Sequence, residues 1–144
     1  MEYERVYELS KRYGPPKVDL REAEILDSYG SEAQAKVAVE HRVPEDVTRE
    51  QLDYYGGVYA FVEETDLLFY LYPVAKAFAD DLNLDCIDSF LYSLEWKIES
   101  LMAGLNEEDG EALKEGLLWI WEAGGTDYAD WVQCPGLQEV IGLM

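Results

Sequence analysis

Side chains of the kind that bind Ca²⁺ are crowded into one short segment after a long apolar run: Asp80, Asp81, Asn83, Asp85 and Asp88. When this segment is aligned with the calcium-binding loop of an EF-hand, Asp81 takes the first ligand position. The sixth position is then Cys86, where the loop needs glycine, and the twelfth is Tyr92, where a bidentate glutamate belongs. We therefore expect these acids to cap the following helix, with a weak cation site near residues 81–88 as the alternative.

Zinc sites and nucleophilic active sites both depend on residue types that are scarce in this chain. Zinc takes four ligands of Cys, His or carboxylate type, whereas the chain has a single His, His41, and two distant cysteines, Cys86 and Cys134. A Ser or Cys nucleophile needs a His base, and only His41 could serve. Because His41 lies near a predicted helix end, we expect it at a helix terminus or on the surface. No glycine-rich nucleotide-binding pattern occurs, so we predict a non-enzymatic protein without catalytic residues, metal or cofactor.

The charge of the chain is strongly negative and unevenly distributed. Its 144 residues include 31 Asp and Glu against 11 Lys and Arg, which gives a formal charge of −20. Residues 1–22 are balanced, but residues 50–144 carry twenty acids and only Lys76, Lys97 and Lys114 as bases. The chain lacks the cations that nucleic-acid phosphates and anionic membranes require, so we expect neither as a direct partner. Most of the carboxylates must instead face water, a bound cation or a basic partner.

Composition and periodicity predict a folded, helical chain. Hydrophobic residues make up 49% of the sequence and aromatic residues 13%, enough to stabilise a core. The length of the chain indicates a single compact domain over residues 1–144, and no linker or internal repeat divides it. The starts of four helices are marked by capping signals: Asp19 with Glu22, Ser31 with Gln34, Thr48, and Asn106. The expected helices cover about residues 2–12, a segment from 19, 31–41, a segment from 48, 65–82, 87–105, 106–123 and 137–143.

The segment 65–82 is the expected centre of this fold. Residues 67–75 are apolar nearly all round, and a helix without a polar side is a buried one. Pro73 removes one intrahelical hydrogen bond, which favours a kinked helix. Two half-helices, or a strand followed by a helix that starts at Pro73, are the alternatives. The predicted fold class is thus an all-α, compact multi-helix domain around a buried central helix.

The next segment has the clearest amphipathic pattern in the chain. Apolar residues at helical spacing predict its buried side: Ile87, Phe90, Leu91, Leu94, Ile98, Leu101, Met102 and Leu105. On the reverse side Tyr92 lies among Asp88, Glu95 and Glu99, which is typical of an interface anchor ringed by charge, unless Tyr92 only places its hydroxyl in water. The candidate partner-binding residues are this tyrosine and the acids on and near this helix: Glu63, Glu64, Asp66, Asp80, Asp81, Asp85, Asp88, Tyr92, Glu95 and Glu99.

Two features of the sequence bear on the cellular location of the protein, namely its first residues and its longest apolar run. The chain opens without the basic and apolar pattern of a secretory signal. Its longest apolar run is shorter than the ~20 residues of a membrane-spanning helix. We therefore expect a cytoplasmic protein, in which Cys86 and Cys134 are buried free thiols rather than a disulfide.

Two phrases of the sequence resemble a small, functionally uncharacterised bacterial family of helical proteins. Residues 58–74 (VYAFVEETDLLFYLYPV) are similar to a family phrase like Phe-Tyr-Leu-Pro-Ala-Tyr in a buried helix. Residues 105–119 resemble a later phrase like Leu-Thr-Glu-Glu-Gln-x-x-Ala-Leu-x-x-Phe-Leu-x-Trp. The likeness covers roughly residues 20–123, although Tyr72 is inserted before the proline and Val74 replaces an alanine. The resemblance implies packing motifs of a helical fold and transfers no catalytic residue.

Size, charge and expected compartment also resemble those of bacterial immunity proteins, which are kept against secreted toxins. A nuclease toxin presents a basic cleft to phosphates, and an acidic protein can fill that cleft with electrostatically steered association. We therefore expect an acidic binding protein, most concretely an immunity-type inhibitor of a basic toxin or nuclease. A phage-type DNA mimic is one alternative, because acids three or four positions apart on a helix approach phosphate spacing. A housekeeping domain with a merely solvated acidic face is the other.

Overall fold

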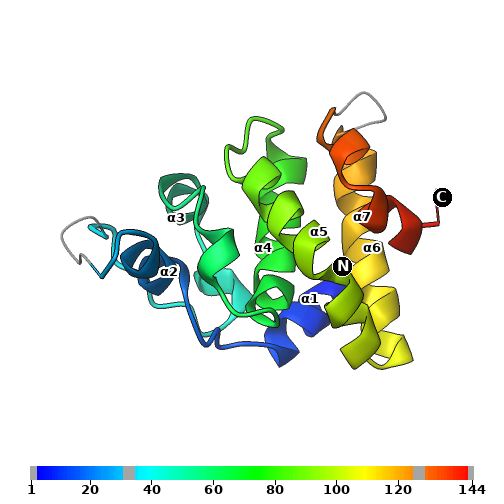
Figure 1. Ribbon diagram of the computed structural model, residues 1–144, viewed down its shortest axis with the longest axis horizontal. Helices are drawn as coiled ribbons and strands as arrows, with labels where there is room; N and C mark the ends of the chain where they lie inside the picture. Colours follow the sequence, from blue (N-terminus) through cyan, green and yellow to red (C-terminus); the bar gives the residue numbers. More distant parts are fainter. Residues whose placement is uncertain (1–2, 31–34, 125–128, 143–144) are drawn as a thin grey trace.

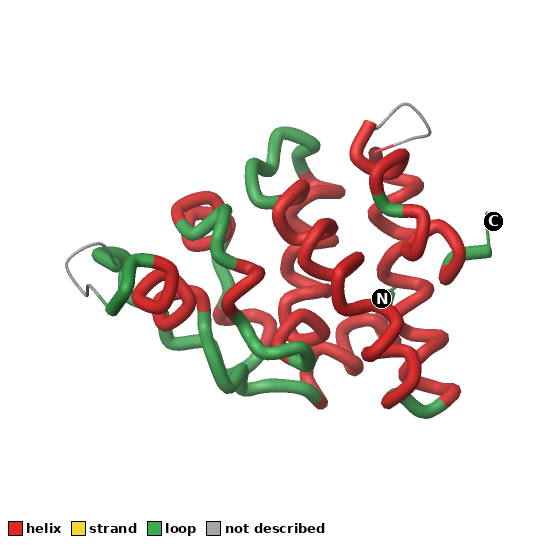
Figure 2. Tube along the Cα trace, in the orientation of Figure 1, coloured by secondary structure: helices red, strands yellow, loops and turns green. Residues whose placement is uncertain are grey.

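The computed structural model describes residues 3–30, 35–124 and 129–142. Helices make up the regular structure of these residues, and no strand occurs among them (Figure 1, Figure 2). The predicted all-α class is therefore confirmed. The α-helices are α1 (Glu4–Arg12), α2 (Leu20–Asp27), α3 (Arg49–Tyr54), α4 (Asp66–Asp80), α5 (Ile87–Gly104), α6 (Glu107–Gly124) and α7 (Pro135–Val140). Short 3₁₀ turns are η2 (Pro44–Asp46), η3 (Tyr59–Phe61) and η4 (Ala129–Gln133).

Helix α4 lies at the centre of the fold, with α5 in front of it and α6 beside it (Figure 1). Every residue from Asp66 to Ala75 is buried, and so is Phe78. The apolar run thus predicts the central helix correctly. The helix continues through Pro73, so the alternatives of two half-helices or of a strand and a helix are wrong.

The hydroxyl group of Ser10 on α1 reaches α4 at the turn that Pro73 disturbs. It accepts a hydrogen bond from the Tyr72 backbone N–H at 3.0 Å and donates to the Leu68 carbonyl at 2.7 Å. In a regular helix these two backbone groups bond to each other. Because a proline ring crowds the preceding turn of its helix, the buried hydroxyl supplies a polar partner where the helix needs one.

Helix α6 also approaches α4 closely and is joined to α1 by polar contacts. Gly116 lies against Leu71, and a Cβ atom at this glycine would stand 2.6 Å from a Leu71 methyl group. Only glycine therefore fits there without movement of the core. Asp109, buried in the first turn of α6, is bound by the Arg12 guanidinium and by the Tyr13 hydroxyl, the latter at 3.0 Å.

Several helix starts follow the capping signals of the sequence. Asp19 and Thr48 each form a capping box with the residue three positions on. Asn106 accepts the backbone N–H three positions on at 2.7 Å. The N-cap of α5 is instead Cys86, without a side-chain hydrogen bond, so the prediction that the acids after α4 cap this helix is wrong. The signal at Ser31 lies outside the described residues.

Residues 35–41 are not helical, which contradicts the helix predicted to run through them. Side chains from the α3 region bind their carbonyl groups. The Tyr55 hydroxyl donates to the Val37 oxygen, and the Gln51 amide nitrogen donates to the Ala38 oxygen at 3.1 Å. These bonds, made by residues distant in sequence, take the place of a helical ladder.

Helix α5 buries most of the side that its pattern predicts. The buried residues are Ile87, Phe90, Leu91, Leu94, Ile98 and Leu101. Met102 is 36% exposed and Leu105 is half-buried, because both lie where the helix ends. Cys86 and Cys134 are both buried and are not joined by a disulfide, as expected. None of the described helices is long and apolar enough to span a membrane.

Candidate functional site

Among the candidate acids, Asp66 is the one whose carboxylate is most extensively hydrogen-bonded within the fold. It is 1% exposed, and its carboxylate accepts the backbone N–H groups of Lys17 at 2.8 Å, Val18 at 2.9 Å and Glu63 at 3.0 Å. Such charge-assisted bonds are among the strongest that a fold can make. The carboxylate joins the chain before α2 to the start of α4 and is not available to a partner.

The other acids beside α4 fall into two separate groups. Glu63 and Glu64 precede the helix, whereas Asp80 and Asp81 lie at its far end, about 21 Å away at 1.5 Å per residue. Asp80 pairs with Lys76 of the same helix at 3.0 Å. The structure therefore does not bring these four acids together.

The loop after α4 does not gather the ligands of a cation site. Asp81 accepts the Asn83 backbone N–H at 3.0 Å and faces the Arg49 guanidinium at 3.7 Å. Asp85 donates its own backbone N–H to the Asp53 carboxylate at 3.3 Å. Among the described residues, no group of three or more His, Cys, Asp or Glu side chains is placed to hold a metal ion.

The remaining candidates follow one another along the outer side of α5. Asp88 and Glu99 are exposed, and Tyr92 and Glu95 are half-buried. They recur at intervals of three and four residues, so neighbouring side chains lie about 5–6 Å apart at Cβ. Four of the predicted residues therefore do share one helix face.

Glu95 holds the short helix α7 against α5. Its carboxylate oxygens accept the backbone N–H groups of Gly136 and Leu137, each at 2.9 Å. These donors belong to the first turn of α7, where helix N–H groups lack partners within the helix. A Cβ atom on Gly136 would lie 2.8 Å from the carboxylate, so glycine permits the close approach. The contact leaves Glu95 in a fixed position.

Trp96 is the residue of this face that the sequence reasoning missed. It is 88% exposed, the largest exposed fraction of any tryptophan or phenylalanine in the described part of the chain. The sequence spacing could have identified it, because Trp96 lies four residues after Tyr92 and three before Glu99, on the polar side of the helix. A large aromatic group in that register belongs to the residue types that are enriched at protein interfaces.

One cavity beside Trp96 lies between η3 and α5. It measures about 450 Å³ and is lined by Ala60, Ser89, Tyr92, Ser93, Trp96 and Lys97. Lys97 donates a hydrogen bond from Nζ to the Val62 carbonyl at 3.1 Å. The Lys97 side chain therefore already supplies a positive charge to this cavity.

A second cavity beside Trp96 lies between α5 and α7, and we name it the α5–α7 groove. It measures about 660 Å³ and is lined by Glu95, Trp96, Ile98, Glu99, Met102, Gly136, Glu139 and Val140. None of these lining residues is a Lys or Arg. Within the described part of the chain, neither Glu99 nor Glu139 forms an ion pair. The groove thus combines carboxylates, an apolar lining and an exposed indole.

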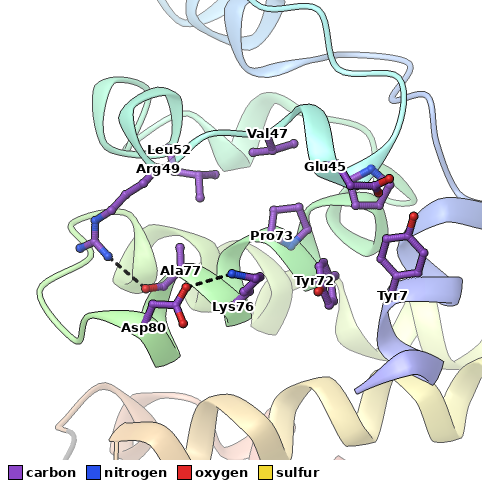
Figure 3. A pocket seen from close by; sticks show the side chains of 11 residues that line it. Tyr7, Glu45, Val47, Arg49, Leu52, Tyr72, Pro73, Lys76, Ala77 and Asp80 are labelled. Carbon is purple, nitrogen blue, oxygen red and sulfur yellow. Dashed lines mark hydrogen bonds and ion pairs between the residues drawn. The ribbon is translucent and has the colours of Figure 1, made fainter. Parts of the chain in front are cut away.

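A further cleft, which we name the α3–α4 cleft, lies between α4 and the segment from η2 to α3 and measures about 590 Å³ (Figure 3). Apolar side chains, including Val47, Leu52 and Pro73, occupy its middle, with Tyr7 and Tyr72 at one end (Figure 3). A volume of this size suits a small organic ligand.

The polar groups of this α3–α4 cleft are already paired with one another. Arg49 donates to the Ala77 carbonyl at 3.0 Å, and Lys76 pairs with Asp80 (Figure 3). At the other end, a hydrogen bond with Glu45 raises the pKa of the Tyr7 hydroxyl to about 12. The cleft therefore offers apolar surface with few free polar groups.

His41 is 5% exposed, so the prediction of a terminal or surface position is wrong. Its Nε2 atom lies 2.7 Å from the Gln51 amide oxygen, and its Nδ1 atom lies 2.9 Å from the Tyr70 hydroxyl. Because an amide oxygen only accepts, we assign the proton to Nε2 and let Tyr70 donate to Nδ1. Burial lowers the pKa of His41, which favours this neutral form. Its nitrogens thus face a Gln and a Tyr, which is not the arrangement of a base beside a Ser or Cys nucleophile.

No protein-family model, curated protein or solved structure matches this chain. The resemblance of residues 20–123 to a bacterial helical family stays a prediction, and so does the likeness to immunity proteins. The function is therefore inferred from the geometry of α5, its neighbours and their charges.

Proposed function

We propose that this protein is a non-enzymatic binding protein that docks a basic protein partner on the outer side of α5. Its most concrete form is an immunity-type inhibitor of a basic toxin or nuclease. The observation that carries the proposal is Trp96, which lies 88% exposed between two cavities on this helix. Tryptophan is enriched among the residues that dominate binding energy at protein interfaces.

The charge around Trp96 fits a cationic partner. Asp88 and Glu99 are exposed on the same helix, and Glu139 of α7 lines the adjacent groove. The chain as a whole carries a charge of −20. Such a field attracts basic proteins over a distance and accelerates their association.

The arrangement of apolar and acidic groups favours an inhibitor of one protein over a DNA mimic. A mimic needs acids spread along an elongated surface in place of phosphates, whereas an inhibitor needs acids around an apolar anchor. On α5 the exposed Glu99 lies three residues after Trp96, and Met102 is also partly exposed. The phage-type DNA mimic therefore stays the second proposal.

The experiment is affinity capture from the source cell with the full chain, followed by calorimetry with the purified captured protein. We expect a basic protein that binds in a fixed ratio at low ionic strength and far more weakly at high ionic strength, since salt screens surface charges. Trp96→Ala should weaken binding by about 2 kcal/mol or more, about thirtyfold.

Tyr29→Ala is the matched control, because Tyr29 is a fully exposed aromatic residue just after α2, and α2 lies away from α5 (Figure 1). It should leave binding unchanged. A complex that is insensitive to both salt and Trp96→Ala would contradict the proposal. Capture of a DNA-binding enzyme that releases DNA would favour the mimic instead.

A further inference from the structure

We propose that the α5–α7 groove receives an arginine side chain of the partner, with its guanidinium group between the Trp96 indole and the carboxylates of Glu99 and Glu139. This inference rests on the proposed function and names the group that the docking surface recognises. It follows from the shape of the groove, its charge and the rigidity of its walls.

The apolar lining of the groove matches the aliphatic part of a long side chain. Ile98, Met102 and Val140 contribute apolar surface from α5 and α7. Arginine carries three methylene groups before its charged end, and these groups gain free energy when they leave water. An arginine that enters along this lining therefore needs a charged or aromatic partner only at its tip.

The rim of the groove supplies that partner. Glu99 and Glu139 come from different helices and form no ion pair in the described part of the chain. Trp96 presents an exposed ring to the same cavity. A guanidinium group can stack on an indole while it donates hydrogen bonds in its plane to carboxylates.

The walls of the groove are held in place before any partner binds. Glu95 binds the backbone N–H groups of Gly136 and Leu137 and so joins α7 to α5. A preorganised site loses less entropy on binding than a flexible one. Glu95 acts here as a positioning residue, because its carboxylate is occupied by α7.

Two other cavities of the protein fit a cation less well. Lys97 already lines the cavity between η3 and α5 and repels a second positive charge. In the α3–α4 cleft, Lys76 pairs with Asp80 and Arg49 bonds to backbone carbonyls. The α5–α7 groove is therefore the one of these three sites that has carboxylates without a cation of its own.

Arginine is favoured over lysine by the geometry of the rim. A guanidinium group is planar and presents donors in several directions, so it can reach carboxylates on two helices while it lies on a ring. An ammonium group is a compact, strongly hydrated point charge and stacks less well. Both carry one positive charge, so long-range attraction alone does not separate them.

The experiment is an NMR titration of the isotope-labelled full chain with blocked peptides Gly-Arg-Gly, Gly-Lys-Gly and Gly-citrulline-Gly at low ionic strength. The indole N–H signal of Trp96 is the one that disappears in Trp96→Phe. We expect the arginine peptide to shift this signal with a dissociation constant of about 1 mM, the scale of a single side-chain contact. The lysine peptide should bind about threefold more weakly, and the uncharged citrulline peptide about tenfold more weakly.

Single substitutions locate the binding site. Glu99→Gln and Glu139→Gln should each weaken the arginine peptide about threefold, in the range of exposed ion pairs. Glu50→Gln on α3 is the control, since it removes the same charge from an exposed position outside the groove. It should have no effect.

Equal binding of the three peptides, no shift with any of them, or an equal effect of Glu50→Gln would overturn the inference. The outcome is distinguishable from a failure of the proposed function. A partner that needs Trp96 but tolerates Glu99→Gln and Glu139→Gln would keep the docking surface and remove the arginine. If the arginine peptide binds in the groove but no protein partner is found in the cell, the arginine site would stand and the proposed function would fail.

Discussion

The α1–α4 side of the molecule and the α5–α7 groove use polar groups in opposite ways. The first side is defined by four buried polar residues, Ser10, Asp66, His41 and Tyr70, and the side chain of each of these four bonds to a partner within the protein. In the groove, Glu99 and Glu139 face solvent without an ion pair in the described residues. Polar groups on the α1–α4 side stabilise the fold, whereas Glu99 and Glu139 of the groove are, in our proposal, available to a partner.

This difference shows that the number of acids is a poor guide to a docking surface. Asp66 and Glu99 are both acids in the highly charged part of the chain, yet one is 1% exposed and the other is exposed. A buried carboxylate that accepts backbone N–H groups is part of the fold. Substitutions can therefore separate the two regions by their effects on stability and on binding.

The largest effect is expected for Asp66→Ala. The substitution leaves the backbone N–H groups of Lys17, Val18 and Glu63 without their shared acceptor. We expect the free energy of unfolding to fall by about 3 kcal/mol or more in urea denaturation. Glu63→Ala removes an exposed acid next to the same site and should change stability by less than about 0.5 kcal/mol. Similar losses for the two variants would contradict the assignment of Asp66 to the fold.

Ser10→Ala should destabilise the protein by about 2 kcal/mol. It removes the hydroxyl that bonds to the Tyr72 N–H and the Leu68 carbonyl inside the core. Ser100→Ala on the exposed side of α5 is the control and should be neutral or slightly stabilising, since alanine is the better helix former. Thermal and urea denaturation of both variants measure the difference. A neutral Ser10→Ala would mean that α4 needs no partner beside its proline.

The stability of the α1–α4 side should depend on pH through His41. Burial lowers the pKa of this histidine in the folded protein, whereas the unfolded chain takes up a proton near 6.5. As pH falls below about 6.5, only the unfolded state gains the proton, so stability decreases by at most about 1.4 kcal/mol per pH unit until the folded form is protonated too. Above about pH 6.5 His41 is neutral in both the folded and the unfolded state, so its titration no longer lowers the stability.

The His41 effect is isolated by comparison with His41→Gln, because the chain has no second histidine. The difference in unfolding free energy between the wild type and His41→Gln should shrink as the pH is lowered from 7.5 to 5.5. A constant difference over this range would show that His41 titrates alike in both states.

A smaller effect is expected for Glu95→Gln, at the groove residue that joins α7 to α5. Glutamine keeps one acceptor oxygen but loses the charge that faces the first turn of α7. We expect a loss of about 1 kcal/mol, the usual worth of a helix cap. Hydrogen exchange should become faster at the Gly136 and Leu137 amides while α4 stays protected. Unchanged exchange there would contradict the role of Glu95 in holding α7.

The smallest effect on stability is expected in the groove itself. Glu99→Gln and Glu139→Gln together should change the free energy of unfolding by less than about 0.5 kcal/mol, because both side chains lie at the surface without an ion pair in the described residues. The same double variant should weaken partner binding. A large loss of stability would move these acids into the same class as Asp66.

Helix positions were predictable because their causes are local. The apolar run of α4 and the alternating sides of α5 are visible within a few residues, and so are the caps Asp19, Thr48 and Asn106. The prediction failed at residues 35–41, where the Val37 and Ala38 carbonyl groups bond to side chains from the α3 region. No pattern inside that segment could reveal acceptors that are taken by distant donors.

The candidate site was only partly predictable. The polar side of α5 predicted a shared face for Asp88, Tyr92 and Glu99, but Trp96 was left out although its spacing fits the same face. Asp66 was placed at the surface because a carboxylate usually faces water. Its partners come from residues 17 and 18, almost fifty positions earlier, which only packing brings to it.

The sequence by itself determined that this chain is helical, strongly acidic and poor in His and Cys, because periodicity, capping, composition and net charge depend on residue identity and short spacing. The tertiary structure decided which acids are consumed inside the fold, and that α7 lies against α5 to form a groove beside Trp96. The physical reason is that the role of a carboxylate depends on the hydrogen-bond donors that lie within bonding distance of it. Packing of the chain selects these donors, and it joins residues that lie far apart in the sequence.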